Sequence, residues 1–193
     1  RKSMKKFFAS LLALVGMVAG LALTSCGGGG GQTNLDNTNI IVSGGGISYQ
    51  ISFGSKLEGT GLYDGYIGEV TGLKGVRVLI SPSVNVKKTD TETGLPSDMS
   101  CTMSMAEWEN ESAAVFAAIL SGGYKSNVNG FSANNLTFTL KEDGGAYSLT
   151  WSWTGEASYT TPNENGNGSI THDIEGDGAG NEITHTGVAV TRG

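Results

Sequence analysis

Two histidines are the residues whose type and spacing could support chemistry. His172 lies in the segment SITHDI and His185 in ITHT. Each histidine shares a face of its predicted strand with the aliphatic residues. If these strands form a hairpin with Ile174 opposite Ile183, the histidines face each other with Cβ atoms about 4.5–5.5 Å apart. Two such imidazoles can bind Zn²⁺ or Cu²⁺, although a catalytic zinc needs a third protein ligand. The alternative is a packed or hydrogen-bonded histidine pair in a half-buried sheet.

The connection between these two strands is acidic and rich in glycine. Asp173, Glu175 and Asp177 alternate before Gly178, which resembles the first half of an EF-hand calcium loop. The twelfth position is Thr184 rather than a bidentate Glu, and the flanks are predicted strands rather than helices. Gly and Asp are also common turn residues. The loop is therefore predicted to be a solvated turn, with Ca²⁺ binding as the alternative.

An aromatic row could stack against a sugar ring. Tyr147, Trp151 and Trp153 share one face of a predicted strand whose other face carries Ser and Thr. If exposed, such a row would be an apolar patch with a function. If buried, it is the core face of the strand. Tyr159 follows Gly155, where the alternation can shift, so its surroundings can differ from those of the other three.

Known catalytic motifs are absent from the sequence. It contains no Gly-x-Ser-x-Gly, His-Glu-x-x-His or Cys-x-x-Cys segment. Cys101 lies on the same face of a predicted strand as Met99 and Met103, which indicates a small residue packed in the core. We therefore expect a protein that is not an enzyme.

Strands must position these residues. Alternation with period two dominates residues 40–193, as in segments 47–53, 136–140 and 147–153. Short Gly-rich turns such as KEDGG join consecutive strands, which implies antiparallel pairing. Pro82 is expected to end the strand before it, because proline cannot donate to a ladder. The predicted fold class is all-β, an antiparallel β-sandwich or barrel.

One segment, near residues 107–120, has helical spacing instead. Ser104 and Glu107 fit a capping box at its start, and Gly122 and Gly123 supply its end. Its apolar residues recur on one helical face: Trp108, Val115, Phe116, Ile119 and Leu120. We expect one short α-helix that closes an end of the sandwich or barrel.

Charge is distributed unevenly along the chain. Four of the 12 Lys and Arg residues lie in the first six positions, which leaves 8 basic against 18 acidic residues, a net charge of −10. Binding to nucleic acid or to an anionic lipid surface needs clustered Lys and Arg. Nucleic acid is therefore not an expected partner.

Residues 4–26 read MKKFFASLLALVGMVAGLALTSC. A basic start, an apolar run and small residues before Cys26 follow the order of a secretory signal peptide. The segment LTSC resembles the lipobox of bacterial lipoproteins: aliphatic, small, small, Cys. That resemblance implies that residues 1–25 are removed, with Met4 as the natural start, and that Cys26 carries acyl chains such as palmitate in the membrane.

Gly27 rather than Asp follows Cys26. In the enterobacterial lipoprotein pattern, Asp at this place retains a protein at the inner membrane, so Gly27 implies export to the outer membrane. Residues 26–39 begin with the lipidated Cys and five glycines and are predicted to form a flexible tether. A single β-rich domain at 40–193 would follow.

These features predict a lipid-anchored envelope lipoprotein that presents a non-catalytic binding or structural module. Its partner would be a glycan, a small apolar ligand or another envelope protein. A metal-binding protein or hydrolase using His172 and His185 is one alternative. A subunit of a surface assembly is another, and an unpaired edge strand would favour it. No cofactor is expected unless the histidines hold Zn²⁺ or the acidic loop holds Ca²⁺.

Overall fold

The computed structural model describes residues 35–57, 62–103, 107–108, 110–177 and 180–193. The predicted signal peptide (1–25), Cys26 and the tether up to residue 34 lie outside the described residues. Gln32–Gly193 is one compact unit. Its elements follow in the order β1 (Asn39–Gly44), β2 (Ile47–Lys56), β3 (Leu62–Val70), β4 (Leu73–Thr89), β5 (Pro96–Met103), β6 (Glu107–Trp108), α1 (Asn110–Ser121), β7 (Gly130–Asp143), β8 (Ala146–Pro162), β9 (Ser169–Ile174) and β10 (Glu182–Arg192).

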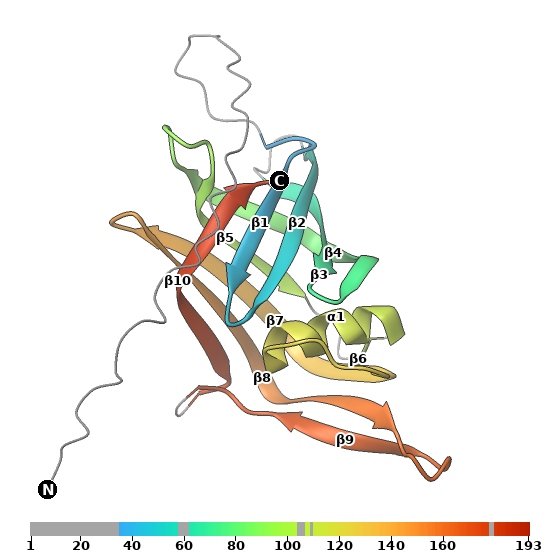
Figure 1. Cartoon of the computed structure of the whole chain (residues 1–193). Coiled ribbons are helices and arrows are strands. Elements are labelled where there is room, and N and C mark those ends of the chain that lie inside the picture. Colours follow the sequence, from blue (N-terminus) through green and yellow to red (C-terminus); the bar gives the residue numbers. More distant parts are fainter. Residues whose placement is uncertain (1–34, 58–61, 104–106, 109, 178–179) are drawn as a thin grey trace, which may run out of the picture. The chain divides into compact units, whose positions relative to one another are not determined.

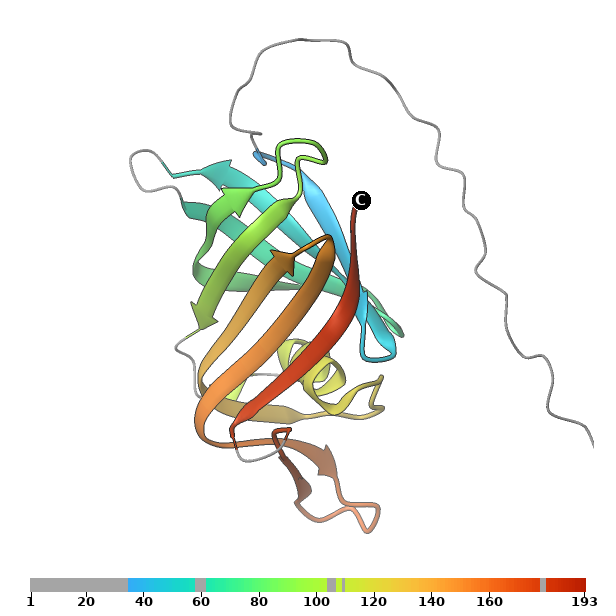
Figure 2. The same ribbon diagram turned by 90° about the vertical axis from the view of Figure 1, so that its left-hand side faces the viewer.

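Eight of these strands form an antiparallel β-barrel (Figure 1, Figure 2). Their order around the barrel is β7, β5, β4, β3, β2, β1, β10 and β8, and a long β7–β8 ladder closes the circle. Most neighbours in space are also neighbours in sequence, which makes this an up-and-down barrel. The predicted all-β antiparallel class is confirmed, and closure makes it a barrel rather than a sandwich.

Side chains of one parity fill the barrel. Trp151 is fully buried, and its ring centroid lies 6.3 Å from that of Tyr49, 5.3 Å from that of Phe138 and 6.3 Å from that of Phe116. The interior of an eight-stranded barrel is just wide enough to be filled by side chains. This aromatic cluster is therefore the core of the fold.

Helix α1 lies across one end of the barrel (Figure 2). Its Phe116 stacks on Phe131 of β7 at 5.5 Å between ring centroids. The predicted end of the helix is confirmed, because Gly122 has a φ of 73° and the Gly123 amide donates to the Ala118 carbonyl at 3.0 Å.

The predicted start of the helix at 107 is wrong. Glu107 and Trp108 form the short strand β6, which pairs with Ser132 and Phe131 of β7, so the helix begins only at Asn110. Glu107 cannot complete a capping box from a strand. The apolar spacing that placed Trp108 on the helix face does not distinguish a helical turn from a strand that precedes it.

Two other predicted boundaries are also wrong. Strand β4 continues through Pro82, because a bulge there carries two extra residues between the pairs Gly65–Ile80 and Tyr63–Val84. The domain begins before residue 40, since Leu35 is only 1% exposed and belongs to the core. Burial of this side chain places residues 35–39 in the barrel domain instead of the tether.

Strands β7 and β8 extend beyond the barrel. A two-residue turn joins them, with φ of 59° at Gly144 and 88° at Gly145, as a tight hairpin requires. Further along, their ladder shifts register between Ala133 and Thr137, opposite Gly155 on β8. Past this irregularity β8 pairs with β9, and the two form an arm that projects from the barrel (Figure 1).

Two buried polar groups lie within the aromatic core. The Tyr49 hydroxyl and the Trp151 Nε1–H have no hydrogen-bond partner among the described residues. Burial raises the pKa of Tyr49, and the neighbouring Trp151 side chain offsets only part of that rise. Burial also raises the pKa of the Cys101 thiol to about 12, in keeping with its place in the core.

The raised pKa of Tyr49 makes stability depend on alkaline pH. Unfolded tyrosine ionises near pH 10, so the stabilisation by neutral Tyr49 is present below pH 10 and is lost as the pH rises above it. We expect Tyr49→Phe to match the parent at pH 7 within about 1 kcal/mol. Above pH 10 its free energy of unfolding should fall less steeply, by about 1.4 kcal/mol per pH unit. Urea unfolding of residues 32–193 followed by circular dichroism at pH 7, 10 and 11 measures this, and equal slopes would contradict it.

Candidate functional site

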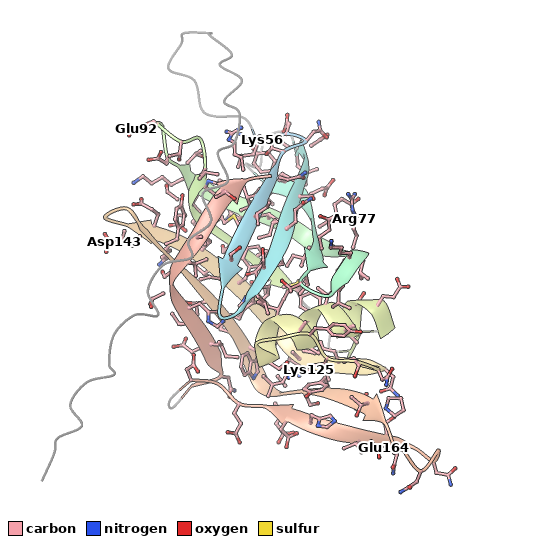
Figure 3. All side chains as sticks on the ribbon, in the orientation of Figure 1. Lys56, Arg77, Glu92, Lys125, Asp143 and Glu164 are labelled. Atoms are coloured by element: carbon pink, nitrogen blue, oxygen red, sulfur yellow. The ribbon has the colours of Figure 1, made fainter. Side chains whose placement is uncertain are left out.

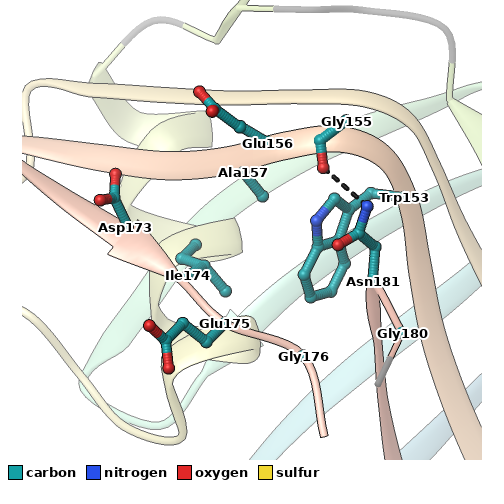
Figure 4. A pocket seen from close by; sticks show the side chains of 10 residues that line it. All are labelled: Trp153, Gly155, Glu156, Ala157, Asp173, Ile174, Glu175, Gly176, Gly180 and Asn181. Atoms are coloured by element: carbon teal, nitrogen blue, oxygen red, sulfur yellow. Dashed lines mark hydrogen bonds between the residues drawn. The ribbon is translucent and has the colours of Figure 1, made fainter. Parts of the chain in front are cut away.

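A pocket lies on the side of the barrel where β8 bends. It has a cavity volume of about 460 Å³ and is formed by β8, the end of β9 and the connection into β10. Trp153, Ala157 and Ile174 are buried and supply its apolar floor. The remaining lining residues are Gly155, Glu156, Asp173, Glu175, Gly176, Gly180 and Asn181 (Figure 4). We call this set the β8 pocket.

Main-chain and side-chain hydrogen bonds hold the walls of the β8 pocket together. The Trp153 amide donates to the Asn181 carbonyl at 3.0 Å, and the Asn181 side-chain amide donates to the Gly155 carbonyl at 2.8 Å (Figure 4). The Thr184 amide donates to the Asp177 carboxylate at 3.1 Å. These bonds fix the start of β10 against the bend of β8, so the pocket has a defined shape.

Close approach of main chain explains one glycine in the pocket wall. A Cβ on Gly176 would overlap the Gly180 carbonyl oxygen and would lie 2.7 Å from the Glu182 amide nitrogen. Any side chain at position 176 would therefore push the connection outward. Gly155 has a φ of 71°, a conformation that glycine adopts freely, and it permits the bend in β8.

The pocket is acidic on its rim. Glu156, Asp173 and Glu175 are exposed and carry its carboxylates, and Figure 4 shows all three extending away from Trp153. No Lys, Arg or His lines the pocket. Its surface therefore favours a ligand that donates hydrogen bonds or carries positive charge.

The predicted pairing of His172 with His185 is wrong. Strands β9 and β10 do not pair with each other but with different parts of β8, so His172 lies opposite Tyr159 and His185 opposite Leu149. The His172 ring stacks on Tyr159 at 4.7 Å and its Nε2 is 2.9 Å from the Thr161 hydroxyl. Period-two parity places a residue on a face of a sheet but does not identify the strand beside it.

His185 packs elsewhere, against the turn between β1 and β2. A Cβ on Gly45 would lie 2.5 Å from His185 Cε1, so the ring occupies the space above that glycine. Within the described residues, no three His, Cys, Asp or Glu side chains are grouped so that they could hold a metal ion.

The three acidic residues of the loop have different surroundings. Asp173 and Glu175 line the β8 pocket, whereas Asp177 accepts the hydrogen bond from Thr184 and does not line it. The structure thus does not bring Asp173, Glu175 and Asp177 together as the predicted calcium ligands. Strand geometry at Asp173 is the reason, since an EF-hand wraps its ligands around the ion in a tight loop.

Of the two interpretations of the aromatic row, the structure supports the core face of a strand and not the stacking platform. Trp151 is fully buried and Trp153 is 5% exposed, so neither offers an aromatic face to a sugar, and Tyr147 is half-buried. Closure of the barrel turns this face of β8 toward the barrel interior. Tyr159 keeps the same parity beyond Gly155 and is half-buried beside His172.

Sequence reasoning missed Asn181, Glu156 and the pocket itself. The pocket exists because an irregular connection crosses a bulge in β8, and neither feature has a periodic signal. The only sequence signal was glycine at positions 155, 176 and 180, which marks turns in general.

Comparisons with protein-family models, curated proteins and solved structures found no match to this chain. In the part of the chain that the structure describes, no helix has the length and apolar character needed to cross a membrane.

Proposed function

We propose that this chain is a lipid-anchored protein of the bacterial cell envelope that binds a small ligand in the β8 pocket without catalysis. The β8 pocket carries this proposal, because its volume of about 460 Å³ falls in the range of small-molecule sites. It is built on a closed barrel whose own interior is filled by Trp151 and its aromatic neighbours. A rigid frame with a lateral pocket suits binding.

The lipid anchor rests on residues 4–26, with their basic start, apolar run and LTSC segment. Two or more acyl chains hold a protein stably in a bilayer, whereas one holds it only reversibly. Gly27 after the cysteine supports the outer membrane as the destination.

Replacing the lipid-carrying residue tests the anchor. The full chain, started at Met4, is expressed in a bacterium with two membranes that is fed an alkyne fatty acid. We expect the label on the parent in the membrane fraction and no label on Cys26→Ala. Cys101→Ala is the matched control and should be labelled like the parent, because its thiol is buried. Labelling of Cys26→Ala, or no labelling of the parent, would contradict the anchor.

Charge reversal at the rim tests the pocket. Residues 32–193 are melted with a panel of neutral sugars, amino sugars, uronic acids, amines and fatty acids. A ligand of the folded state at 100 times its Kd stabilises it by about 2.7 kcal/mol. We expect Glu175→Lys to abolish the response to the best ligand. Glu164→Lys, at the tip of the arm (Figure 3), makes the same charge change outside the pocket and should keep the response. Equal effects of the two variants, or no response in the parent, would refute the pocket.

A second function, as a subunit of a surface assembly, is favoured by the arm. Among the described residues β9 pairs only with β8, so its other edge is unpaired. The Asn163 amide donates to the Gly168 carbonyl at 3.0 Å. From this pair onward, residues of β9 alternately direct their main-chain N–H and C=O groups toward β8 and away from it. Ser169, Thr171 and Asp173 therefore direct their main-chain groups outward. A second copy could pair there with Thr171 opposite Thr171 and Ser169 opposite Asp173, without like charges meeting.

Proline at the outward position tests this pairing. Thr171→Pro removes an outward N–H and leaves the donors to β8 intact. We expect the parent to associate with rising concentration in analytical ultracentrifugation and Thr171→Pro to remain monomeric. Thr171→Val keeps the N–H and should associate like the parent. A parent that is monomeric at every concentration would remove the assembly function.

A further inference from the structure

We infer that the β8 pocket binds a neutral or cationic sugar residue, held by hydrogen bonds to the edge of Trp153 and to the rim carboxylates, and that it rejects anionic sugars. This inference rests on the proposed function, since it names the ligand class of the same pocket.

The Trp153 indole supplies the first half of the argument. Its side chain is 95% buried, yet its Nε1–H donates no hydrogen bond to any described residue, whereas its main-chain amide is bonded to Asn181. Figure 4 shows this nitrogen facing the side of the pocket where Ala157 and Ile174 lie. Unlike the Trp151 N–H, which is fully enclosed, the Trp153 N–H is open to the pocket. An acceptor on a ligand in the pocket can therefore bond to it.

The rim supplies the second half. Glu156, Asp173 and Glu175 present carboxylate acceptors, and no basic side chain lines the pocket to balance them. The amide nitrogen of Asn181 is already bonded to Gly155, which leaves its side-chain oxygen as a further acceptor. An anionic group at the rim would therefore meet like charge, whereas a hydroxyl or an ammonium group could donate to these side chains.

These two features narrow the ligand class. A metal ion has no acceptor for the indole N–H, and an apolar ligand would leave that N–H without a partner. A sugar hydroxyl both donates and accepts, and the C–H face of the ring can lie against Ile174 and Ala157. The glycines at 155, 176 and 180 let such a ligand approach the main chain closely. Because the Trp153 ring is covered, recognition uses its edge and not its face.

Three monosaccharides test the inference: glucose, glucosamine, which differs from glucose only at C2, and glucuronate, which differs from glucose only at C6. Each is titrated at pH 6.5 into ¹⁵N-labelled residues 32–193. The indole signal of Trp153, assigned by its loss in Trp153→Phe, reports on the pocket. We expect it to shift saturably with glucosamine and glucose and to respond about tenfold more weakly to glucuronate. The Trp151 indole signal is the internal control and should not move, since Trp151 is enclosed in the barrel. Glu175→Gln should weaken glucosamine more than glucose.

Two results would overturn the inference. One is glucuronate binding as tightly as glucose, and the other is sugar binding that leaves the Trp153 signal unchanged. If no sugar binds but another compound of the panel stabilises the protein in a Glu175-dependent way, the sugar class is wrong and the proposed function stands. If no compound binds, both are wrong.

Discussion

The interruption of the β7–β8 ladder is the constraint on which the rest of this structure depends. Strand β8 must pair with β7 and β10 in the barrel and with β9 in the arm. One strand has only two edges, so β10 and β9 pair with successive stretches of the edge that β7 leaves free. Between these stretches Gly155, with its positive φ, allows β8 to bend, and Asn135 on β7, with a φ of 50°, accompanies the bend. The β8 pocket is the space that opens inside the bend.

Packing and function are separated by this arrangement. Trp151 and Trp153 are two residues apart on the same face of β8, and the core around Trp151 leaves its indole N–H enclosed. Trp153, next to the bend, is the point where the same face reaches the wall of the pocket. An eight-stranded barrel filled with aromatic side chains has little room for a ligand inside. The β8 pocket accordingly lies at the side of the barrel, and not on its axis.

The sequence predicted the local features of this fold better than its pairings. Alternation in 136–140 and 147–153 and the glycines at 144 and 145 correctly predicted the longest hairpin, because side-chain parity and turn chemistry are local. The proposed hairpin between Ile174 and Ile183 was wrong, because β8 is long enough to offer each of these strands its own stretch. Likewise, the pocket depends on a bulge and an irregular connection, which leave no periodic pattern to read.

Charge selection at the β8 pocket must come from its own rim. The chain beyond the first six residues carries a net charge of −10, and three of its carboxylates line the pocket. At physiological ionic strength, interactions between exposed charges fade beyond about 8 Å. Glu156, Asp173 and Glu175 belong to the lining itself. The proposed discrimination against anions therefore depends on these three side chains, and the overall acidity of the domain acts chiefly on solubility and on approach.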